Sequence, residues 1–336
     1  MYTKTTFGSL ANRPVTAYTI ENINGLRMTL LDYGATWYAL EVPTHTGHQN
    51  IMLNTDLAGY AEPTGYFGKP LGRVAGRIGE GQLMMNGKPW PLPANEGTTT
   101  LHGGPHGYST LWWQAAPAND QVTFTRTIPS SLDGFPGDLT ASVTYTLTDS
   151  DEVHIDFTGT SPEETVFNPT NHAYWNLNAT DETIGNHELM VAAQQRFEAP
   201  LSKVPTDHLL DVTGTPFDFT TPRQMGPQLA ALRDTPERGI DDIYYIGEHD
   251  ADQPVATLRC GDLGVEFYSK RNALILFTAN KFGDELHFLE KKSRPYVGVA
   301  LEPQTAPRAV VNPDFGDIRL APGETGQAQL RYHFTY

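Results

Sequence analysis

Hydrophobic and polar positions alternate along much of this chain. The clearest run is residues 139–147, LTASVTYTL, in which Leu, Ala, Val, Tyr and Leu are separated by Thr and Ser. After a turn-like DSDE segment, the alternation resumes in VHIDFTG at residues 153–159. A period of two is the pattern of a strand with one buried face. These two runs therefore predict a β-hairpin.

Similar patterns predict further strands. The alternation recurs in LRMTL, QVTFTRTI and AQLRYHFTY, at residues 26–30, 121–128 and 328–336. The segments at 265–268 and 273–279 are more uniformly apolar, which predicts strands buried on both faces. Helical periodicity is best at residues 227–234, PQLAALRD, where we expect a short helix on a connection.

These patterns favour an all-β protein, with two or more antiparallel sheets packed face to face and a few short helices on connections. The 31 glycines and 25 prolines fit many short elements joined by turns. Strand patterns continue from residue 15 to the last residue without a linker or an internal repeat. We therefore expect residues 1–336 to form one domain, with two fused small sandwiches as the alternative.

Composition narrows the class of partner. The formal net charge is −16, which argues against a nucleic acid or an anionic membrane surface. No apolar run is long enough to span a membrane, and the first residues lack the apolar core of a signal peptide. The single cysteine, Cys260, has no partner for an internal disulfide. These features predict a soluble cytoplasmic protein.

Several cofactor motifs fail on inspection. The glycines of GRVAGRIGEG, residues 72–81, do not fit the dinucleotide-binding pattern. Residues 81–89 resemble a phosphate-binding loop, but their glycines are too far apart and Pro89 replaces the required Ser or Thr. The pairs His45/His48 and His102/His106 lie in loops without companion ligands. We therefore expect neither a nucleotide cofactor nor a metal.

Five segments instead place polar groups among Gly, Pro and aromatic residues. A basic side chain, two histidines and two carboxylates near Trp, Tyr and Asn suit a sugar site, because aromatic faces cover the ring while charged groups hold its hydroxyls. Taken singly, His172 also fits a histidine hydrogen-bonded among buried aromatics, and Glu302 fits a carboxylate paired with Arg308. The segments are GRVAGRI (72–78), LHGG (101–104), NPTNHAYWNL (168–177), GIDDIYY (239–245) and ALEPQTAP (300–307).

In their order and spacing, these segments resemble the galactose mutarotases, or aldose 1-epimerases, over nearly the whole chain. The resemblance implies a galactose mutarotase-like β-supersandwich with an open cleft and no cofactor, as a monomer or homodimer. It implies that His172 is the general acid and Glu302 the general base, with His102 steadying the C1 oxygen. The sugar-binding residues that we expect from it are Arg77, Asp241, Gly76 and Trp175.

The reaction implied is the interconversion of the α and β anomers of an aldohexose such as galactose or glucose. The C1 hydroxyl loses a proton while the ring oxygen gains one, the ring opens, and it recloses on the other face of the carbonyl. Ordinary pKa values, about 4.3 for Glu and 6.5 for His, would give an optimum near neutral pH.

The sequence also departs from the family pattern. Gly76 stands where Asn is common, Asp242 where His is common, and Ile275 near a frequent Gln. Because strand residues alternate, we expect Asp241 and Asp242 to point to opposite sides, with Asp241 facing the sugar.

Other functions stay open at this point. The same chemistry on maltose, a hexose 6-phosphate or a sulfosugar is one, although the acidic chain shows no basic cluster for a phosphate or sulfonate. A glycoside hydrolase or lyase using Asp241 and Glu302 is another. A non-catalytic carbohydrate-binding sandwich is the third.

Overall fold

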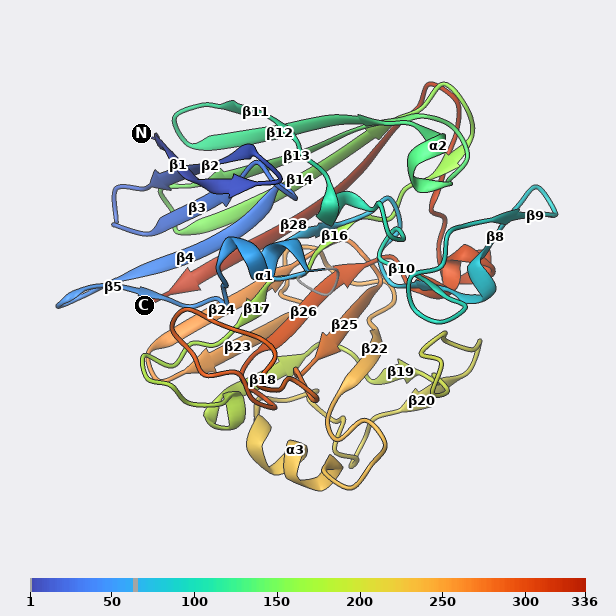
Figure 1. Ribbon diagram of the computed structural model, residues 1–336. Helices are drawn as coiled ribbons and strands as arrows, with labels where there is room; N and C mark the ends of the chain where they lie inside the picture. Colours follow the sequence, from blue (N-terminus) through green and yellow to red (C-terminus); the bar gives the residue numbers. More distant parts are fainter. Residues whose placement is uncertain (1, 63–65) are drawn as a thin grey trace.

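The computed structural model describes residues 2–62 and 66–336 and consists mainly of antiparallel strands (Figure 1). The largest sheet has nine strands. Its strands, in spatial order, are β11 (Gln114–Pro117), β12 (Gln121–Ile128), β13 (Leu139–Leu147), β14 (Glu152–Thr160), β28 (Thr325–Thr335), β24 (Leu263–Tyr268), β23 (Ala256–Cys260), β18 (Glu188–Val191) and β21 (Arg223–Gln224).

Two smaller sheets complete the layers. The five-stranded sheet runs in sequence order: β1 (Tyr2–Leu10), β2 (Arg13–Glu21), β3 (Arg27–Leu31), β4 (Thr36–Thr44) and β5 (Gly47–Asn50). The six-stranded sheet has the order β17 (Tyr174–Trp175), β26 (Val299–Gln304), β25 (Ala273–Phe277), β22 (Asp241–Tyr245), β19 (Gln195–Phe197) and β20 (Leu209–Asp211).

Short elements fill the connections. Two-stranded pairs are formed by β6 (Pro70–Leu71) with β16 (Thr170–Asn171), β7 (Arg77–Ile78) with β10 (Thr100–Leu101), β8 (Gln82–Met85) with β9 (Lys88–Pro91), and β15 (Thr165–Val166) with β27 (Arg319–Leu320). The described residues form three short helices, α1 (Leu57–Ala61), α2 (Ser130–Asp133) and α3 (Met225–Leu232). None of these helices is long and apolar enough to cross a membrane.

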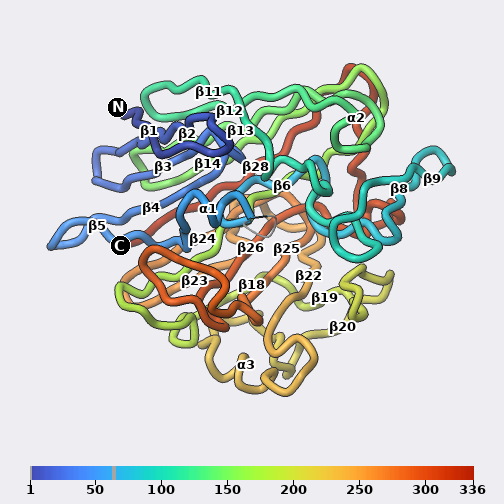
Figure 2. The backbone as a smooth tube through the Cα atoms, in the orientation of Figure 1, coloured from blue at the N-terminus to red at the C-terminus, as the bar shows by residue number. Residues whose placement is uncertain are grey.

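The main hydrophobic core lies where the three large sheets meet, and it includes residues from Tyr18 to Phe334. Trp37 on β4 packs edge-on against Tyr332 of β28, with ring centroids 5.3 Å apart, and against Trp175 of β17 at 5.5 Å. Figure 2 shows how the chain brings its blue N-terminal and red C-terminal strands together around this point. The predicted all-β sandwich is confirmed.

The predicted hairpin is present, since β13 and β14 pair antiparallel with Val143 opposite Phe157. The expectation that residues 265–268 are buried on both faces is wrong. The outer face of β24 stays partly open, and there Glu266 accepts hydrogen bonds from Tyr268 and His333. It is also wrong for residues 273–279, because one face of β25 lines a cavity instead of packing in the core.

Candidate active site

One cavity brings together most of the polar residues that the sequence singled out. It lies against the face of the six-stranded sheet that is turned away from the main core, and the loops around β7 and β10 close one side. Its lining residues are Tyr66, Gly76, Arg77, Leu101, His102, His172, Tyr174, Ala199, Lys203, Asp241, Ile243, Ile275, Phe277, Glu302, Gln304 and Pro307.

Strand alternation selects which side chains reach the cavity. On β25, Ile275 and Phe277 line it, whereas Leu274 and Leu276 between them belong to the main core. Glu302 lies directly opposite Ile275 in the pairing of β26 with β25. Because successive strand side chains point to opposite faces, the sheet presents one face to the cavity and the other to the main core.

Trp175 corrects the sequence-based expectation of a sugar contact. Its side chain is 0% exposed and packs in the main core, 5.8 Å from the ring of Phe267 and 5.7 Å from that of Tyr332. Its neighbour Tyr174 occupies the cavity face instead. The strand β17 has only two residues, too few for the sequence to reveal which of them faces inward.

Glu302 and His172 touch each other in the cavity wall. The Oε1 atom of Glu302 lies 3.2 Å from Nε2 of His172, and the residues are 2% and 5% exposed. The ring of Tyr66 stacks on that of His172 at 5.9 Å, and the ring of Tyr174 lies 4.8 Å away. Arg308, the alternative partner of Glu302, instead pairs with Asp207 at 2.6 Å.

Burial shifts the pKa values of both Glu302 and His172, so the expectation of ordinary pKa values is wrong. Desolvation, aided by the charge of Arg77, lowers the pKa of His172 to about 3. Desolvation and the nearby Asp241 raise the pKa of Glu302 well above its usual range. Each charged form alone is disfavoured in this site. Glu302 and His172 together therefore hold a single proton over a wide pH interval. This proton is shared and is not assigned to either residue alone.

His102 is held as a neutral hydrogen-bond donor. Its Nδ1 accepts a 3.2 Å hydrogen bond from the backbone N–H of Gly76, and its own backbone N–H donates to the Gly76 carbonyl at 2.9 Å. Burial, His172 and Arg77 together lower the pKa of His102 well below its usual range. With Nδ1 accepting, the ring proton resides on Nε2.

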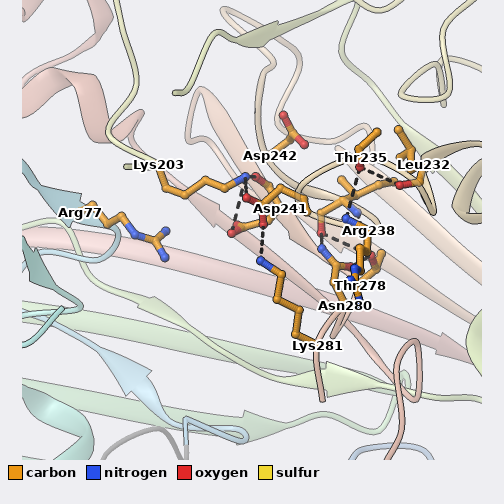
Figure 3. Close-up of polar contacts among 12 residues, drawn as sticks. Arg77, Lys203, Leu232, Thr235, Arg238, Asp241, Asp242, Thr278, Asn280 and Lys281 are labelled. Carbon is orange, nitrogen blue, oxygen red and sulfur yellow. Dashed lines mark hydrogen bonds and ion pairs between the residues drawn. The ribbon is translucent and has the colours of Figure 1, made fainter. Parts of the chain in front are cut away.

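Arg77 and Asp241 provide opposite charges beside the pair. The Arg77 guanidinium is held by both carboxylate oxygens of Glu96, at 2.6 and 2.9 Å, and it extends toward Asp241 (Figure 3). Lys203 donates to the backbone carbonyl of Asp241 at 3.1 Å and lies 3.4 Å from Glu237. Both cations of the cavity thus already have acidic neighbours.

Asp241 and Asp242 diverge as the strand period predicts. Asp241 lines the cavity, whereas Asp242 points away in Figure 3 and accepts a 2.7 Å hydrogen bond from Arg196. Arg196 Cζ lies 4.2 Å from the centroid of the Phe217 ring, outside the cavity lining. The expectation that the two carboxylates point to opposite sides is therefore confirmed.

The turn before β22 fixes the position of Asp241, which is the first residue of that strand. The Ile240 N–H donates to Thr278 Oγ1 at 3.0 Å, and Asn280 Nδ2 donates to the Ile240 carbonyl at 3.1 Å. A Cβ at Gly239 would come within 2.2 Å of the Asn280 side-chain oxygen. Only glycine allows this close approach.

Among the cavity-lining residues that sequence reasoning missed, four carry polar side chains. Tyr174 and Gln304 stand in quoted motifs, and the period of two relates Gln304 to Glu302. Tyr66 and Lys203 lie on connections, where no periodic signal exists to find them.

Comparison with known proteins now identifies the family. The family model described as aldose 1-epimerase matches residues 16–333. The chain belongs to the aldose 1-epimerase family. The predicted family and enzyme class, an isomerase, are thereby confirmed.

Individual relatives of this aldose 1-epimerase family member agree along the whole chain. A maltose epimerase from Levilactobacillus brevis is 33% identical and covers 99% of this chain and 98% of its own. An aldose 1-epimerase from Streptococcus thermophilus is 34% identical, with 97% and 96% covered. A solved aldose epimerase homologue from C. elegans superposes with a TM-score of 0.84 at 29% identity, covering 95% and 98%.

Proposed function

We propose that the protein interconverts the α and β anomers of an aldohexose such as galactose or glucose, with Glu302 as general base and His172 as general acid. The observation that carries the proposal is the 3.2 Å contact of this pair inside the cavity. The two oxygens that exchange protons with it, the C1 hydroxyl and the ring oxygen, are bonded to the same carbon. Two catalytic groups that touch each other are placed to serve both.

In the reactive form the shared proton lies on His172 and Glu302 is a carboxylate. Glu302 accepts the proton of the C1 hydroxyl while His172 donates its proton to the ring oxygen, and the C1–ring-oxygen bond breaks to give the open aldehyde. After rotation about C1–C2, the ring recloses and both protons return. The pair ends as it began, and each proton transfer contributes roughly 10²–10⁴ in rate.

The other lining residues support binding and orientation. The Nε2–H of neutral His102 is available to the C1 oxygen as its charge changes during ring opening. Arg77 and Asp241 are suited to non-reacting hydroxyls, which would position the ring between acid and base. Tyr174, Phe277 and the nearby Ile275 offer apolar faces for the sugar ring.

The charge pattern of the cavity favours a neutral sugar over a phosphorylated or sulfonated one. Arg77 is held by Glu96 at 2.6 Å, and Lys203 lies between Glu237 and Asp241. A phosphate would have to displace carboxylates from these cations.

Maltose is the second candidate substrate. The relative named maltose epimerase matches this chain at 33% identity over almost its full length. The anomeric chemistry is the same for the reducing glucose unit of maltose.

Polarimetry of freshly dissolved α-galactose, α-glucose, α-xylose and maltose, corrected for the spontaneous rate, tests the proposal. We expect catalysed approach to anomeric equilibrium with at least one free aldohexose, and the ratio of kcat/KM values would identify the preferred sugar. Catalysis of maltose alone would select the second candidate. No acceleration with any of the four sugars would contradict both.

A further inference from the structure

Gln304 is a buried amide in the cavity wall whose hydrogen-bonding capacity is unused. The residue is 0% exposed, and neither Nε2 nor Oε1 has a hydrogen-bond partner among the residues that the structure describes. Buried side-chain amides are almost always hydrogen-bonded. Whichever way the amide is turned, it carries both a donor and an acceptor, and the residue lines the cavity.

The strand places this amide at a defined distance from the reacting centre. Gln304 lies two residues beyond Glu302 on β26, on the same face and about 6.6 Å further along the strand. Opposite Gln304 on β25 is the small Ala273, whereas Glu302 lies opposite Ile275. This spacing favours a contact of the amide with a ring position other than C1 when Glu302 contacts the C1 hydroxyl.

Gly76 leaves space beside the buried amide. A Cβ at this position would lie 3.4 Å from Gln304 Nε2 and 3.1 Å from Pro307 Cγ. A longer side chain at position 76 would extend into the space beside the amide. In this chain that space is part of the cavity, because Gly76, Gln304 and Pro307 all line it.

We propose that Gln304 is a substrate-binding residue whose side-chain amide hydrogen-bonds hydroxyls on the edge of the sugar ring remote from C1. An amide matches a hydroxyl because each is both donor and acceptor. This inference rests on the proposed function, since it assigns a second contact region to the same sugar. It also makes this end of the cavity a determinant of which aldose is preferred.

A residue that binds substrate differs from a structural residue in how its substitution changes the stability of the free protein. Gln304→Met preserves the unbranched shape but removes both polar ends. Replacing an unpartnered buried amide by an apolar group should not destabilise the free protein. We therefore expect an unchanged or higher Tm together with a KM about tenfold higher, the size of one lost neutral hydrogen bond. A lower Tm with unchanged KM would identify a structural residue and overturn the proposal.

Deoxy sugars show where the amide binds. Each of 2-, 3-, 4- and 6-deoxyglucose is assayed by polarimetry with the wild type, with Gln304→Met and with the shorter Gln304→Asn. The proposal predicts that the wild type has a lower kcat/KM for 3- or 4-deoxyglucose than for glucose. Replacing Gln304 by Met or Asn should lower kcat/KM for that deoxy sugar little further. Independent, multiplying losses for all four sugars, or coupling at the 2-position alone, would overturn it.

Ser293→Ala is the matched control. Its Oγ is likewise buried and unpartnered within the described residues, but it lies outside the cavity lining. It should leave KM and the deoxy-sugar pattern unchanged. If the wild type converts no aldose, the proposed function itself fails. If the wild type is active and Gln304→Met binds sugars normally, only the inference about Gln304 fails.

Discussion

At the residue scale, the proton shared by Glu302 and His172 determines how activity depends on pH. The pair gains a second proton only near the lowered pKa of His172, about 3, and loses its single proton only near the raised pKa of Glu302. The active one-proton form therefore persists between these limits. We expect kcat/KM to stay level across pH 6.5, where an ordinary histidine would begin to lose its proton.

A pH profile of kcat/KM, with the spontaneous rate subtracted at each pH, tests this expectation. A decline of tenfold per pH unit above about 6.5 would show that His172 titrates as an ordinary solvated histidine.

The neighbouring carboxylates of β22 provide a second test at this scale. Asp241→Asn removes a charge from the cavity and should raise KM about tenfold, because charge-assisted hydrogen bonds to the sugar are weakened. Asp242→Asn should leave KM nearly unchanged but lower stability by about 1–3 kcal/mol, since Arg196 loses its buried partner. Steady-state kinetics and thermal unfolding of both variants separate the effects. The reverse pattern would mean that Asp242, not Asp241, faces the sugar.

At the element scale, the tight turn that starts β22 positions Asp241. Gly239→Ala forces a Cβ against Asn280, which must shift together with its hydrogen bond to Ile240. We expect a stability loss of about 1–3 kcal/mol and a higher KM. Gly185→Ala is the control, because its Cβ would meet nothing closer than 3.6 Å. Equal effects of the two substitutions on KM would contradict a positioning role for this turn.

Elements with a long alternating pattern could be predicted closely from the sequence. Residues 121–128 and 139–147 form β12 and β13 with the predicted bounds. The site was harder to predict, because its walls come from residues as distant as Tyr66 and Pro307, which only long-range strand pairing brings together. The strand β17 has only two residues, too few to show which side chain faces the cavity. The expected sugar contact of Trp175 was wrong for this reason. The pKa shifts of Glu302 and His172 arise mainly from burial, which local sequence does not reveal.

At the scale of the whole molecule, the main core connects the three large sheets. Trp37 and Trp175, from two different sheets, both pack on Tyr332 of the third. This continuity supports the proposal that residues 1–336 form one domain. Differential scanning calorimetry should show a single transition whose calorimetric and van't Hoff enthalpies agree. Two resolved transitions would favour two separately folding sandwiches.

In the proposed mechanism Glu302 removes the C1 proton, and the substitution Glu302→Gln tests this role. Glutamine preserves shape and hydrogen bonding but does not accept this proton. In polarimetry with the preferred sugar, we predict a kcat lower by roughly 10²–10⁴, equivalent to about 3–5 kcal/mol, with KM little changed. Circular dichroism must show that the variant is folded. A folded Glu302→Gln variant with near-normal kcat would show that Glu302 is not the base and would transfer that role to another carboxylate, with Asp241 the first to test.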